Sequence, residues 1–367
     1  MKVLLVISSL RGGGAERVMT WLADCLIDAG DSVCLITQHE ASDDFYRLNP
    51  AVRRIAVGYG RFFDFPKVRG LIHIWRWRHA LRTVARREQF DVVLSFIDKM
   101  NLSVLSAFAG TGIPVVVAER TDPRYSQLGI FGRTIRTFLY KKLAKRVVVQ
   151  TDAIAARVRN EWGLYSVVVI PNAVLIRAAS TPNQMNRRPC VLCVGRFSRE
   201  KGHDLLIAAW GTLTSEFPDW QLRIVGEGPL RSALEEQVTR LGLAGSVSLP
   251  GMSSDVAEEY GAASIFALPS RFEGFPNALL EAMAFGCAPI ATESAGASVE
   301  VIQSGVNGTL VAGDNVGALA DELGRLMRDR NLRCRYAERA AEVATRYAPE
   351  RIFHLWRQLL ADAAGLT

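Results

Sequence analysis

The chain has 367 residues, of which 49% are hydrophobic and 22% are charged. These fractions are typical of globular proteins and exclude a disordered or fibrous chain. A single hydrophobic core seldom extends beyond about 250–300 residues, so the length predicts two domains. The six cysteines form no regular framework, which favours a reducing compartment over a secreted, disulfide-linked protein. No apolar run reaches the roughly 18 residues that a membrane-spanning helix needs.

The positive charge is concentrated in the first half of the chain. Residues 1–172 contain 25 Lys and Arg against 15 Asp and Glu, a net charge of +10. Residues 173–367 contain 19 against 22, a net charge of −3. A basic half beside a mildly acidic half indicates that one domain meets an anionic partner. Nucleic acid, anionic lipid and a phosphorylated substrate are all compatible with this charge.

Strands and helices are expected to alternate along both halves. The first run, MKVLLVISSL, is followed by Arg11 and three glycines without a cleavage site, and predicts a strand rather than a signal peptide. Continuous apolar runs are typical of parallel strands buried on both faces. They lie at 2–8, 32–37, 91–96, 114–119, 146–151, 166–172, 190–195, 221–228, 246–251, 264–270, 287–293 and 308–311.

This alternation predicts two doubly wound α/β domains. The first covers 1–172 and is joined by a C-terminal helix at 349–367, and the second covers 173–348. The polar stretch with Pro182, Asn183, Gln184 and Asn186 is the predicted linker. Ligands of such sheets bind beyond the carboxyl ends of the strands, so the loops there are the candidates for a site.

The first predicted strand leads into a glycine-rich turn, SSLRGGGAERV (8–18). Three consecutive glycines between a strand and a helix let backbone N–H groups approach an anion at the helix N-terminus. The spacing is not the dinucleotide-binding G-x-G-x-x-G, and no Gly-Lys-Ser/Thr follows, so it is not a P-loop either. A tight turn that needs positive φ explains the same residues equally well.

The second half opens with a strand that runs into GRFSREKGHDLLIAAW (195–210). Arg196 and Lys201 flank a short loop that opens a helix. A guanidinium and an ammonium at a helix N-terminus form a good diphosphate clamp. The alternative is a pair of solvated surface charges.

Two glutamates, Glu273 and Glu281, are eight residues apart in SRFEGFPNALLEAMAFGCAPIAT (270–292). The turn GFPN predicts a helix that starts at Pro276 or Asn277 and places Glu281 about one turn inside it. The apolar neighbours of Glu281 predict a partly buried carboxylate that needs a hydrogen-bonding partner. Two vicinal hydroxyls, as on a ribose, would meet that need. Two surface glutamates are the weaker alternative.

Together these motifs resemble glycosyltransferase family 4. The matching pieces are GGGAERV, the PNAV hinge, GRFSREKG, VGEGPLR (225–231) and the Glu-x7-Glu element, which follow the family's order across nearly the whole chain. The resemblance implies the GT-B fold, in which two Rossmann-like domains face each other across a cleft, and a nucleotide sugar held mainly by the second domain. It also implies transfer with retention of the anomeric configuration.

The resemblance also implies roles for particular residues. Arg196 and Lys201 would bind the diphosphate, Glu281 the ribose hydroxyls, and Glu273 would lie near the sugar with a catalytic role. The remaining donor-binding residues would be those of the turn after Glu273 and those of the first-domain glycine loop: Gly274, Phe275, Pro276 and Asn277, and Gly13 and Gly14.

One first-domain feature departs from the family pattern. Many members carry a His after a first-domain strand, near the reacting sugar, but here that stretch reads VVVAERTDP (115–123). Glu119, Arg120 and Asp122 stand there instead, and Asp98, at the end of DVVLSFIDKMN, is a second candidate. We expect Glu119 and Asp98 to face the cleft and to act as catalytic residues. No Asp-x-Asp metal motif is found, so we expect no metal and no cofactor.

The basic charge of the first half lies mainly in two segments of helical period, 67–87 and 131–146. Basic helices with aromatic residues suit an anionic membrane surface. An amphipathic helix with a solvated basic face is the alternative. Nucleic acid would use similar charge, but no RRM, OB or recognition-helix signature accompanies it, so we expect no nucleic-acid partner. The predicted acceptor- or membrane-contacting residues are Arg69, Trp75, Arg76, Trp77, Arg78 and Arg82.

We therefore expect a cytoplasmic enzyme that is peripheral on the inner face of the cell membrane. It would move a sugar from a UDP-sugar to a hydroxyl of a glycan on a polyprenyl diphosphate, in cell-surface polysaccharide or glycoprotein assembly. The alternatives are a transferase for another lipid or soluble acceptor, an epimerase of the same fold, and a catalytically silent nucleotide-sugar- or membrane-binding protein.

Overall fold

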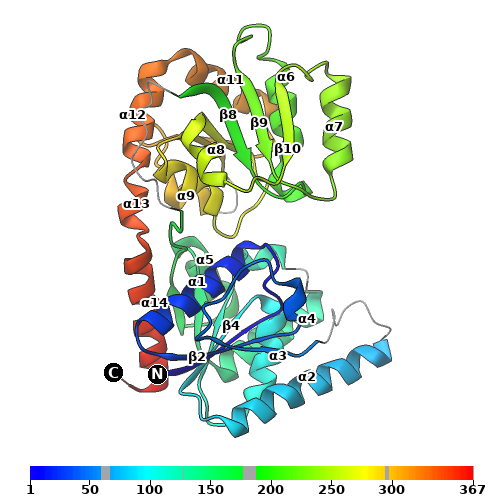
Figure 1. The fold of residues 1–367 in the computed structure, drawn as a ribbon, viewed down its shortest axis with the longest axis vertical. Coiled ribbons are helices and arrows are strands. Elements are labelled where there is room, and N and C mark those ends of the chain that lie inside the picture. The colour runs from blue at the N-terminus through cyan, green and yellow to red at the C-terminus, as the bar shows by residue number, and fades with distance from the viewer. Residues whose placement is uncertain (59–66, 127, 177–186, 294–296, 367) are drawn as a thin grey trace. The chain divides into compact units, whose positions relative to one another are not determined.

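The computed structural model describes residues 1–58, 67–126, 128–176, 187–293 and 297–366. The chain divides into two compact units. Unit 1 comprises Met1–Asn172 and Glu350–Thr367, and unit 2 comprises Ala173–Pro349. Within unit 1, the red C-terminal helix lies beside the N-terminus of the chain (Figure 1).

The described part of unit 1 contains a seven-stranded sheet. Its strands are β1 (Lys2–Ile7), β2 (Ser32–Thr37), β3 (Arg53–Ala56), β4 (Val92–Phe96), β5 (Val115–Ala118), β6 (Ala144–Val149) and β7 (Val167–Val169). Their order is β3-β2-β1-β4-β5-β6-β7, and every neighbouring pair is parallel. In β1, Leu5 pairs with Leu35 on one side and Leu94 on the other. A strand that is covered on both faces has no need for polar alternation, which explains the continuous apolar runs.

Helices cover this sheet, and one of them comes from the end of the chain. They are α1 (Gly14–Asp28), α2 (Lys67–Arg87), α3 (Asp98–Phe108), α4 (Ile130–Leu143), α5 (Asp152–Trp162) and α14 (Pro349–Ala364). Helix α2 packs against α3, and α3 packs against α4. Arg357 Nε of α14 donates to Asp31 Oδ2 at 3.0 Å, and the Trp356 ring lies 5.7 Å from the ring of Phe96. These contacts attach the C-terminal helix to unit 1.

The described part of unit 2 contains a six-stranded parallel sheet in the order β10-β9-β8-β11-β12-β13. The strands are β8 (Arg188–Val194), β9 (Gln221–Val225), β10 (Val247–Gly251), β11 (Ala263–Leu268), β12 (Ala288–Thr292) and β13 (Thr309–Val311). The helices are α6 (His203–Gly211), α7 (Arg231–Arg240), α8 (Val256–Ala262), α9 (Asn277–Ala284), α10 (Ala297–Val301), α11 (Val316–Arg328), α12 (Arg330–Ala340) and α13 (Val343–Arg346).

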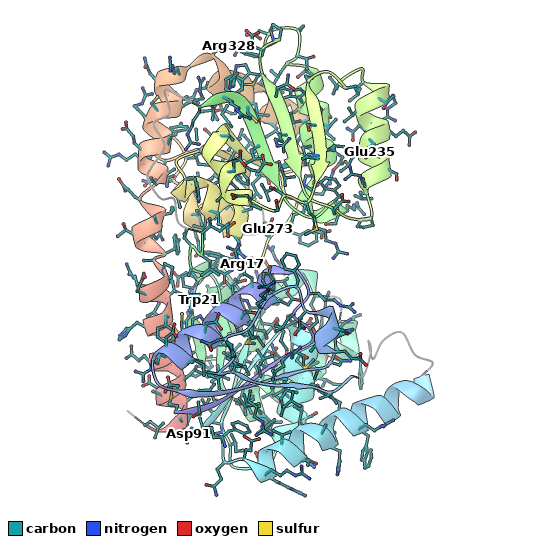
Figure 2. The ribbon with its side chains drawn as sticks, viewed as in Figure 1. Arg17, Trp21, Asp91, Glu235, Glu273 and Arg328 are labelled. Carbon is teal, nitrogen blue, oxygen red and sulfur yellow. The ribbon has the colours of Figure 1, made fainter. Side chains whose placement is uncertain are left out.

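In each sheet the strand order changes direction between two central neighbours. In unit 1 these are β1 and β4, and in unit 2 they are β8 and β11. The loops after such a pair lead away in opposite directions, which leaves a crevice at the carboxyl edge where open α/β sheets bind ligands. We call these edges the unit 1 and unit 2 switch points. The loop 269–276, which follows β11 and carries Glu273, belongs to the unit 2 switch point (Figure 2).

The predicted fold class is confirmed, and each predicted apolar run overlaps a strand. Strand β3 was not predicted, because its sequence RRIA is half charged and its exposed ends leave no apolar run. The predicted helix 131–146 is too long: α4 ends at Leu143 because β6 starts at Ala144. The predicted linker residues Pro182 to Asn186 lie outside the described residues. None of the described helices combines the length and apolarity that crossing a bilayer requires.

Candidate active site

An ion pair joins the two loops of the unit 2 switch point. Lys201, in the loop after β8, places Nζ 2.6 Å from Oε1 of Glu273, in the loop after β11. Ser270 Oγ donates to the same carboxylate oxygen at 2.8 Å. The Glu273 carboxylate is buried and therefore needs these donors. The sequence analysis missed Ser270, although it stands only three residues before Glu273.

Backbone contacts hold the same two loops together. Gly202 has φ +66°, and a Cβ on it would lie 2.1 Å from the carbonyl oxygen of Pro269. The backbone N–H of Arg271 donates to the carbonyl of Glu200 at 2.8 Å, and its guanidinium binds both oxygens of Asp204 at 2.9 and 2.7 Å. Glycine at position 202 thus permits the close approach that brings Lys201 to Glu273.

The segment from the end of β8 to the start of α6 contains four basic residues, Arg196, Arg199, Lys201 and His203. Arg196 is exposed, and its side chain has no hydrogen bond or ion pair with the described residues. Burial alone would lower the pKa of Lys201, but the charge and hydrogen bond of Glu273 outweigh it and raise the pKa. Burial, with help from Lys201, lowers the pKa of His203 to about 4, so His203 is neutral at pH 7. The positive charge of this segment therefore comes from Arg196, Arg199 and Lys201.

Glu281 lies inside α9, as predicted. Pro276 is the N-cap of this helix and Asn277 its first residue, which confirms the predicted start. Glu281 is 5% exposed, and Tyr260 of α8 donates its hydroxyl to Oε2 at 3.1 Å. Tyr260 is the partner that a buried carboxylate needs. Tyr260 was not predicted as this partner, because the two residues are far apart in the sequence and share no motif.

The turn between Glu273 and α9 also packs against the hydrophobic core of unit 2. The Phe275 ring packs edge-on against Tyr347, with ring centroids 5.8 Å apart. The backbone N–H of Asn277 donates to the carbonyl of Phe275 at 3.0 Å. This N–H is therefore already used, and fewer donors of the Gly274–Asn277 turn remain for a ligand than the sequence indicated.

The glycine-rich turn of unit 1 leads directly into α1. Gly13 is the N-cap and Gly14 the first helical residue. Gly13 has φ −106°, so the predicted need for positive φ is wrong at this residue. A Cβ on Gly13 would lie 2.2 Å from Oε2 of Glu16. The glycine therefore makes room for a carboxylate beside the helix N-terminus, where negative charge is stabilised.

The other central strand of unit 1 ends in a strained residue. Ile97, directly after β4, has φ +75°, a conformation that β-branched residues rarely adopt. The next residue, Asp98, begins α3 and accepts hydrogen bonds from the backbone N–H of Lys99, at 2.6 Å, and from Ser126 Oγ. The structure thus places Asp98 at the unit 1 switch point, and its catalytic role stays a prediction.

Glu119 is buried in the interior of unit 1 and does not face solvent at the edge of the sheet. It is 3% exposed and accepts a hydrogen bond from the hydroxyl of Tyr140 at 2.6 Å. Asn101 Nδ2 in turn donates to Tyr140 at 2.9 Å. Burial raises the pKa of Glu119 to about 7. The carboxylate thus has a partner inside unit 1, and its catalytic role stays a prediction.

The neighbours of Glu119 also have partners within unit 1. Arg120 donates from Nη2 to Asn172 Oδ1, and its guanidinium lies 4.6 Å from the ring of Phe96. Asp122 forms ion pairs with Arg124 and Arg157 at 2.9 and 2.8 Å. These contacts hold together the turn that follows β5.

Helix α2 does not present the predicted row of arginines and tryptophans. Trp77 is fully buried in the core of unit 1, so its predicted membrane contact is wrong. Arg78 and Arg82 donate to carbonyls of Ser106 and Ala107 at 2.9 and 2.7 Å, around the C-terminus of α3. They satisfy carbonyls that the helix leaves unpaired, so they are not free for lipid.

The remaining predicted residues of α2 differ in how they are placed. Trp75 is 66% exposed, and its ring is stacked on that of His79 at 5.5 Å. Arg76 is exposed as well. The side chain of Arg69 lies outside the described part of the chain.

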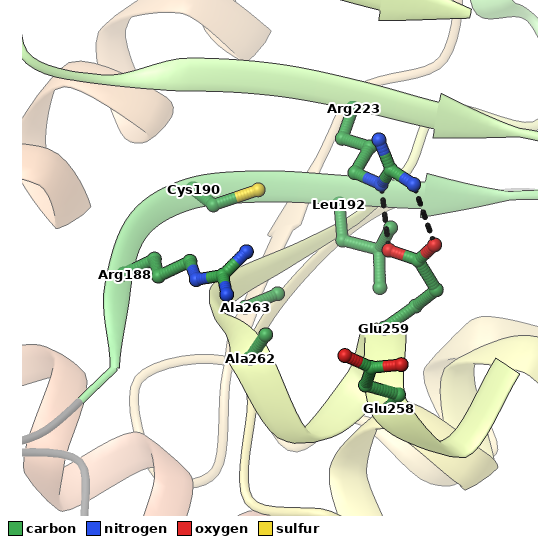
Figure 3. Close-up of a pocket in the computed structure, with 8 residues that line it drawn as sticks. All are labelled: Arg188, Cys190, Leu192, Arg223, Glu258, Glu259, Ala262 and Ala263. Carbon is green, nitrogen blue, oxygen red and sulfur yellow. Dashed lines mark hydrogen bonds and ion pairs between the residues drawn. The ribbon is translucent and has the colours of Figure 1, made fainter. Parts of the chain in front are cut away.

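A pocket of about 220 Å³ lies elsewhere on unit 2 (Figure 3). Arg188, the first residue of β8, marks it as lying at the amino end of this strand, away from the switch point. Arg223 binds both oxygens of Glu259 at 2.6 and 2.7 Å, which neutralises much of its charge. No ligand-binding role was predicted for its lining residues, which are Arg188, Cys190, Leu192, Arg223, Glu258, Glu259, Ala262 and Ala263.

Within the described ranges, no group of three or more His, Cys, Asp or Glu side chains is arranged to hold a metal ion. The expectation that the reaction needs no metal stays a prediction.

Comparison with known proteins matches both halves of the chain to the same class of enzyme. Residues 12–176 match the profile "Glycosyltransferase Family 4", and residues 179–343 match "Glycosyl transferases group 1". The fold matches that of Anabaena HepE, solved in complex with UDP, with a TM-score of 0.82 at 19% identity over 99% of this chain and 100% of that chain. The architecture is therefore that of a GT-B glycosyltransferase.

Two curated relatives are similar in sequence. A Campylobacter jejuni alpha-1,4-N-acetyl-D-galactosaminyltransferase, named for an undecaprenol-diphosphate-linked saccharide, is 26% identical over 99% of both chains. The exopolysaccharide phosphotransferase SCO2592 of Streptomyces coelicolor is 32% identical over 78% of this chain, but the match spans only 29% of that longer protein. The chain belongs to glycosyltransferase family 4, and the protein is a glycosyltransferase.

Proposed function

We propose that the protein transfers a sugar from a UDP-sugar bound at the unit 2 switch point to a hydroxyl of a glycan acceptor. The observation that carries the proposal is the Lys201–Glu273 ion pair across this switch point, with Arg196 exposed beside it. A diphosphate needs concentrated positive charge, and a sugar needs a carboxylate nearby that accepts hydrogen bonds from its hydroxyls. This arrangement supplies both within two adjoining loops.

The proposed reaction needs no metal, because Arg196 and Lys201 stabilise the charge that develops on the leaving group. The bond between the anomeric carbon and the diphosphate oxygen breaks, and the acceptor oxygen bonds to the same face of the sugar. The acceptor proton passes to the leaving diphosphate oxygen. This route gives retention of configuration, and it requires no separate protein base.

Glu281 would bind the ribose of the donor. Its carboxylate is buried in α9 and already oriented by the hydroxyl of Tyr260 at 3.1 Å. A carboxylate has several acceptor positions, so it can accept from Tyr260 and from two ribose hydroxyls together. Binding of UDP in the HepE structure, which shares the fold, supports a uridine donor here.

The acceptor would be a saccharide on a polyprenyl diphosphate, and the enzyme would work at the inner face of the cell membrane. The undecaprenol-diphosphate substrate in the name of the Campylobacter relative supports this acceptor. The net charge of +10 on residues 1–172 supports an anionic partner for this part of the chain. A nucleotide-sugar-binding protein without catalytic activity is the second candidate.

The test is a screen of UDP-sugars for release of UDP, with and without a polyprenyl-diphosphate saccharide. We expect one UDP-sugar to be consumed faster with acceptor, and NMR of the product to show the anomer of the donor. The Arg196→Ala variant should be at least about tenfold slower. Binding of a UDP-sugar without any release of UDP would instead favour the silent binding protein.

A further inference from the structure

Helix α4 of unit 1 packs Leu139 and Leu143 on the core, but it also exposes large apolar side chains and buries two polar ones. Ile130, Phe131 and Phe138 are 87%, 80% and 59% exposed, whereas Arg136 and Tyr140 are 1% and 0% exposed. A helix that only covers a domain has the opposite arrangement. An exposed apolar stripe of this kind marks a surface that meets an apolar partner.

The inward-facing polar residues of α4 are well fixed, so the helix cannot simply rotate to bury its phenylalanines. The Arg136 guanidinium lies 4.1 Å from the centroid of the Trp162 ring. Tyr140 donates to Glu119 and accepts from Asn101. Rotation would break this buried network and would bring Phe131 and Phe138 into space that the network fills.

The exposed stripe is continuous along the helix and ends in cations. Phe131, Ile135 and Phe138 are spaced at i, i+4 and i+7, so they lie on one face. Lys141 and Lys142 follow in the last turn. Between Asp122 and Asp152 the sequence has no acidic residue and seven basic ones. The surface therefore combines apolar side chains with positive charge that no acidic neighbour in the sequence offsets.

We propose that α4 docks on an anionic lipid bilayer, with Ile130, Phe131, Ile135 and Phe138 in the interfacial layer and Lys141 and Lys142 at lipid phosphates. This inference deepens the proposed function, on which it rests for a membrane-borne acceptor. The charge decides the occupant, because apolar side chains and clustered cations on one helix are complementary to anionic lipid. The proposed membrane contact is therefore α4 and not α2. In α2, Trp77 is buried and Arg78 and Arg82 bind carbonyls.

The test is sedimentation of the full chain with vesicles of phosphatidylglycerol and phosphatidylcholine, compared with phosphatidylcholine alone. Phe131→Ser/Phe138→Ser should weaken binding to the anionic vesicles by at least about tenfold, because both side chains lose apolar burial. Trp75→Ser is the control, since Trp75 is 66% exposed on the same unit but belongs to α2. It should bind as the parent does.

The contribution of charge to vesicle binding is tested with two double variants, each of which replaces two basic residues with glutamate. Lys141→Glu/Lys142→Glu should lose binding to anionic vesicles, whereas Arg86→Glu/Arg87→Glu, at the exposed end of α2, should retain most of it. Equal loss in both would assign the binding to overall charge and overturn the proposal. So would vesicle binding by the double Phe variant that matches the parent, or a parent that binds no vesicles.

Two further readouts separate the possible failures. If α4 instead contacts a second copy of the chain, gel filtration will show a dimer in the parent that Phe131→Ser/Phe138→Ser converts to monomer, and the lipid proposal is wrong. UDP affinity is measured on the same variants and should equal that of the parent. A parent that binds vesicles but no UDP would contradict the proposed function and leave the docking surface intact.

Discussion

The two units have similar parallel sheets but differ in the charge at their switch points. In unit 2, Arg196 is exposed and Lys201 reaches across to Glu273. In unit 1, Asp98 at the switch point accepts hydrogen bonds from Lys99 and Ser126, and Glu119, after the neighbouring strand β5, is buried against Tyr140. The sheet thus provides a crevice in both units, but the loops determine which charged side chains are available to a ligand. This difference supports our proposal that the diphosphate binds in unit 2.

The largest effect on activity is expected when a positive charge is removed from the unit 2 switch point. Lys201→Ala should lower kcat/KM for the donor by roughly 30- to 1000-fold, because a cation that stabilises a leaving group contributes about 2–4 kcal/mol. Steady-state kinetics measures the effect, and Lys145→Ala, an exposed lysine of unit 1, is the control. Full turnover in a folded Lys201→Ala protein would remove Lys201 from the mechanism.

In unit 1, the burial of Glu119 should be visible in the pH dependence of the free energy of unfolding. Its pKa is raised from 4.5 to about 7 by burial. Below about pH 4.5 the carboxyl is protonated in both the folded and unfolded states. Between about pH 4.5 and 7 the unfolded chain ionises while the folded one does not, so the parent loses stability as the pH rises, by about 3 kcal/mol in total.

Glu119→Gln should abolish this loss, because the amide does not ionise and can still accept from Tyr140. Denaturant unfolding at pH 5 and pH 8 gives the difference between the two proteins. Glu161→Gln, an exposed carboxyl of the same unit, should change stability by less than about 0.5 kcal/mol at either pH. If parent and Glu119→Gln change equally with pH, Glu119 is not the buried acid that the structure describes.

The two glutamates of unit 2 have different proposed roles, which substitution of each one can distinguish. Glu281→Gln should weaken UDP binding by about tenfold, near 1.4 kcal/mol, because a charged acceptor is lost from the ribose. Glu273→Gln should slow transfer and leave UDP affinity close to that of the parent, because in the proposed function Glu273 acts on the sugar. Titration calorimetry with UDP and kinetics on both variants check this. Unchanged UDP affinity in Glu281→Gln would show that the ribose lies elsewhere.

Much of the fold was predictable from the sequence, because strands buried on both faces need continuous apolar runs. Strand β3 was not, since an edge strand tolerates the charged residues in RRIA. The same contrast holds for the site. The start of α9 and the burial of Glu281 follow from local sequence, but its partner Tyr260 is 21 residues away.

The two basic helices show why the rest could not be predicted. Both α2 and α4 are basic and contain no acidic residue, but tertiary contacts determine which of their side chains are exposed. Arg78 and Arg82 are used by carbonyls of α3, a contact that depends on how two helices pack. The outward position of Phe131 depends on Arg136 and Tyr140 being fixed inside, which no helical periodicity indicates.

The central claim is that the donor diphosphate binds at the carboxyl edge of the unit 2 sheet, at Arg196. Titration calorimetry with UDP tests it most directly on a pair of variants at the two ends of the same strand region, Arg196→Ala and Arg188→Ala. Both residues are exposed arginines, but Arg188 lies at the amino end of β8, beside the pocket of Figure 3. The account predicts that Arg196→Ala weakens UDP binding by at least about tenfold, while Arg188→Ala binds UDP as the parent does. Undiminished affinity in Arg196→Ala, or loss of binding in Arg188→Ala, would contradict it.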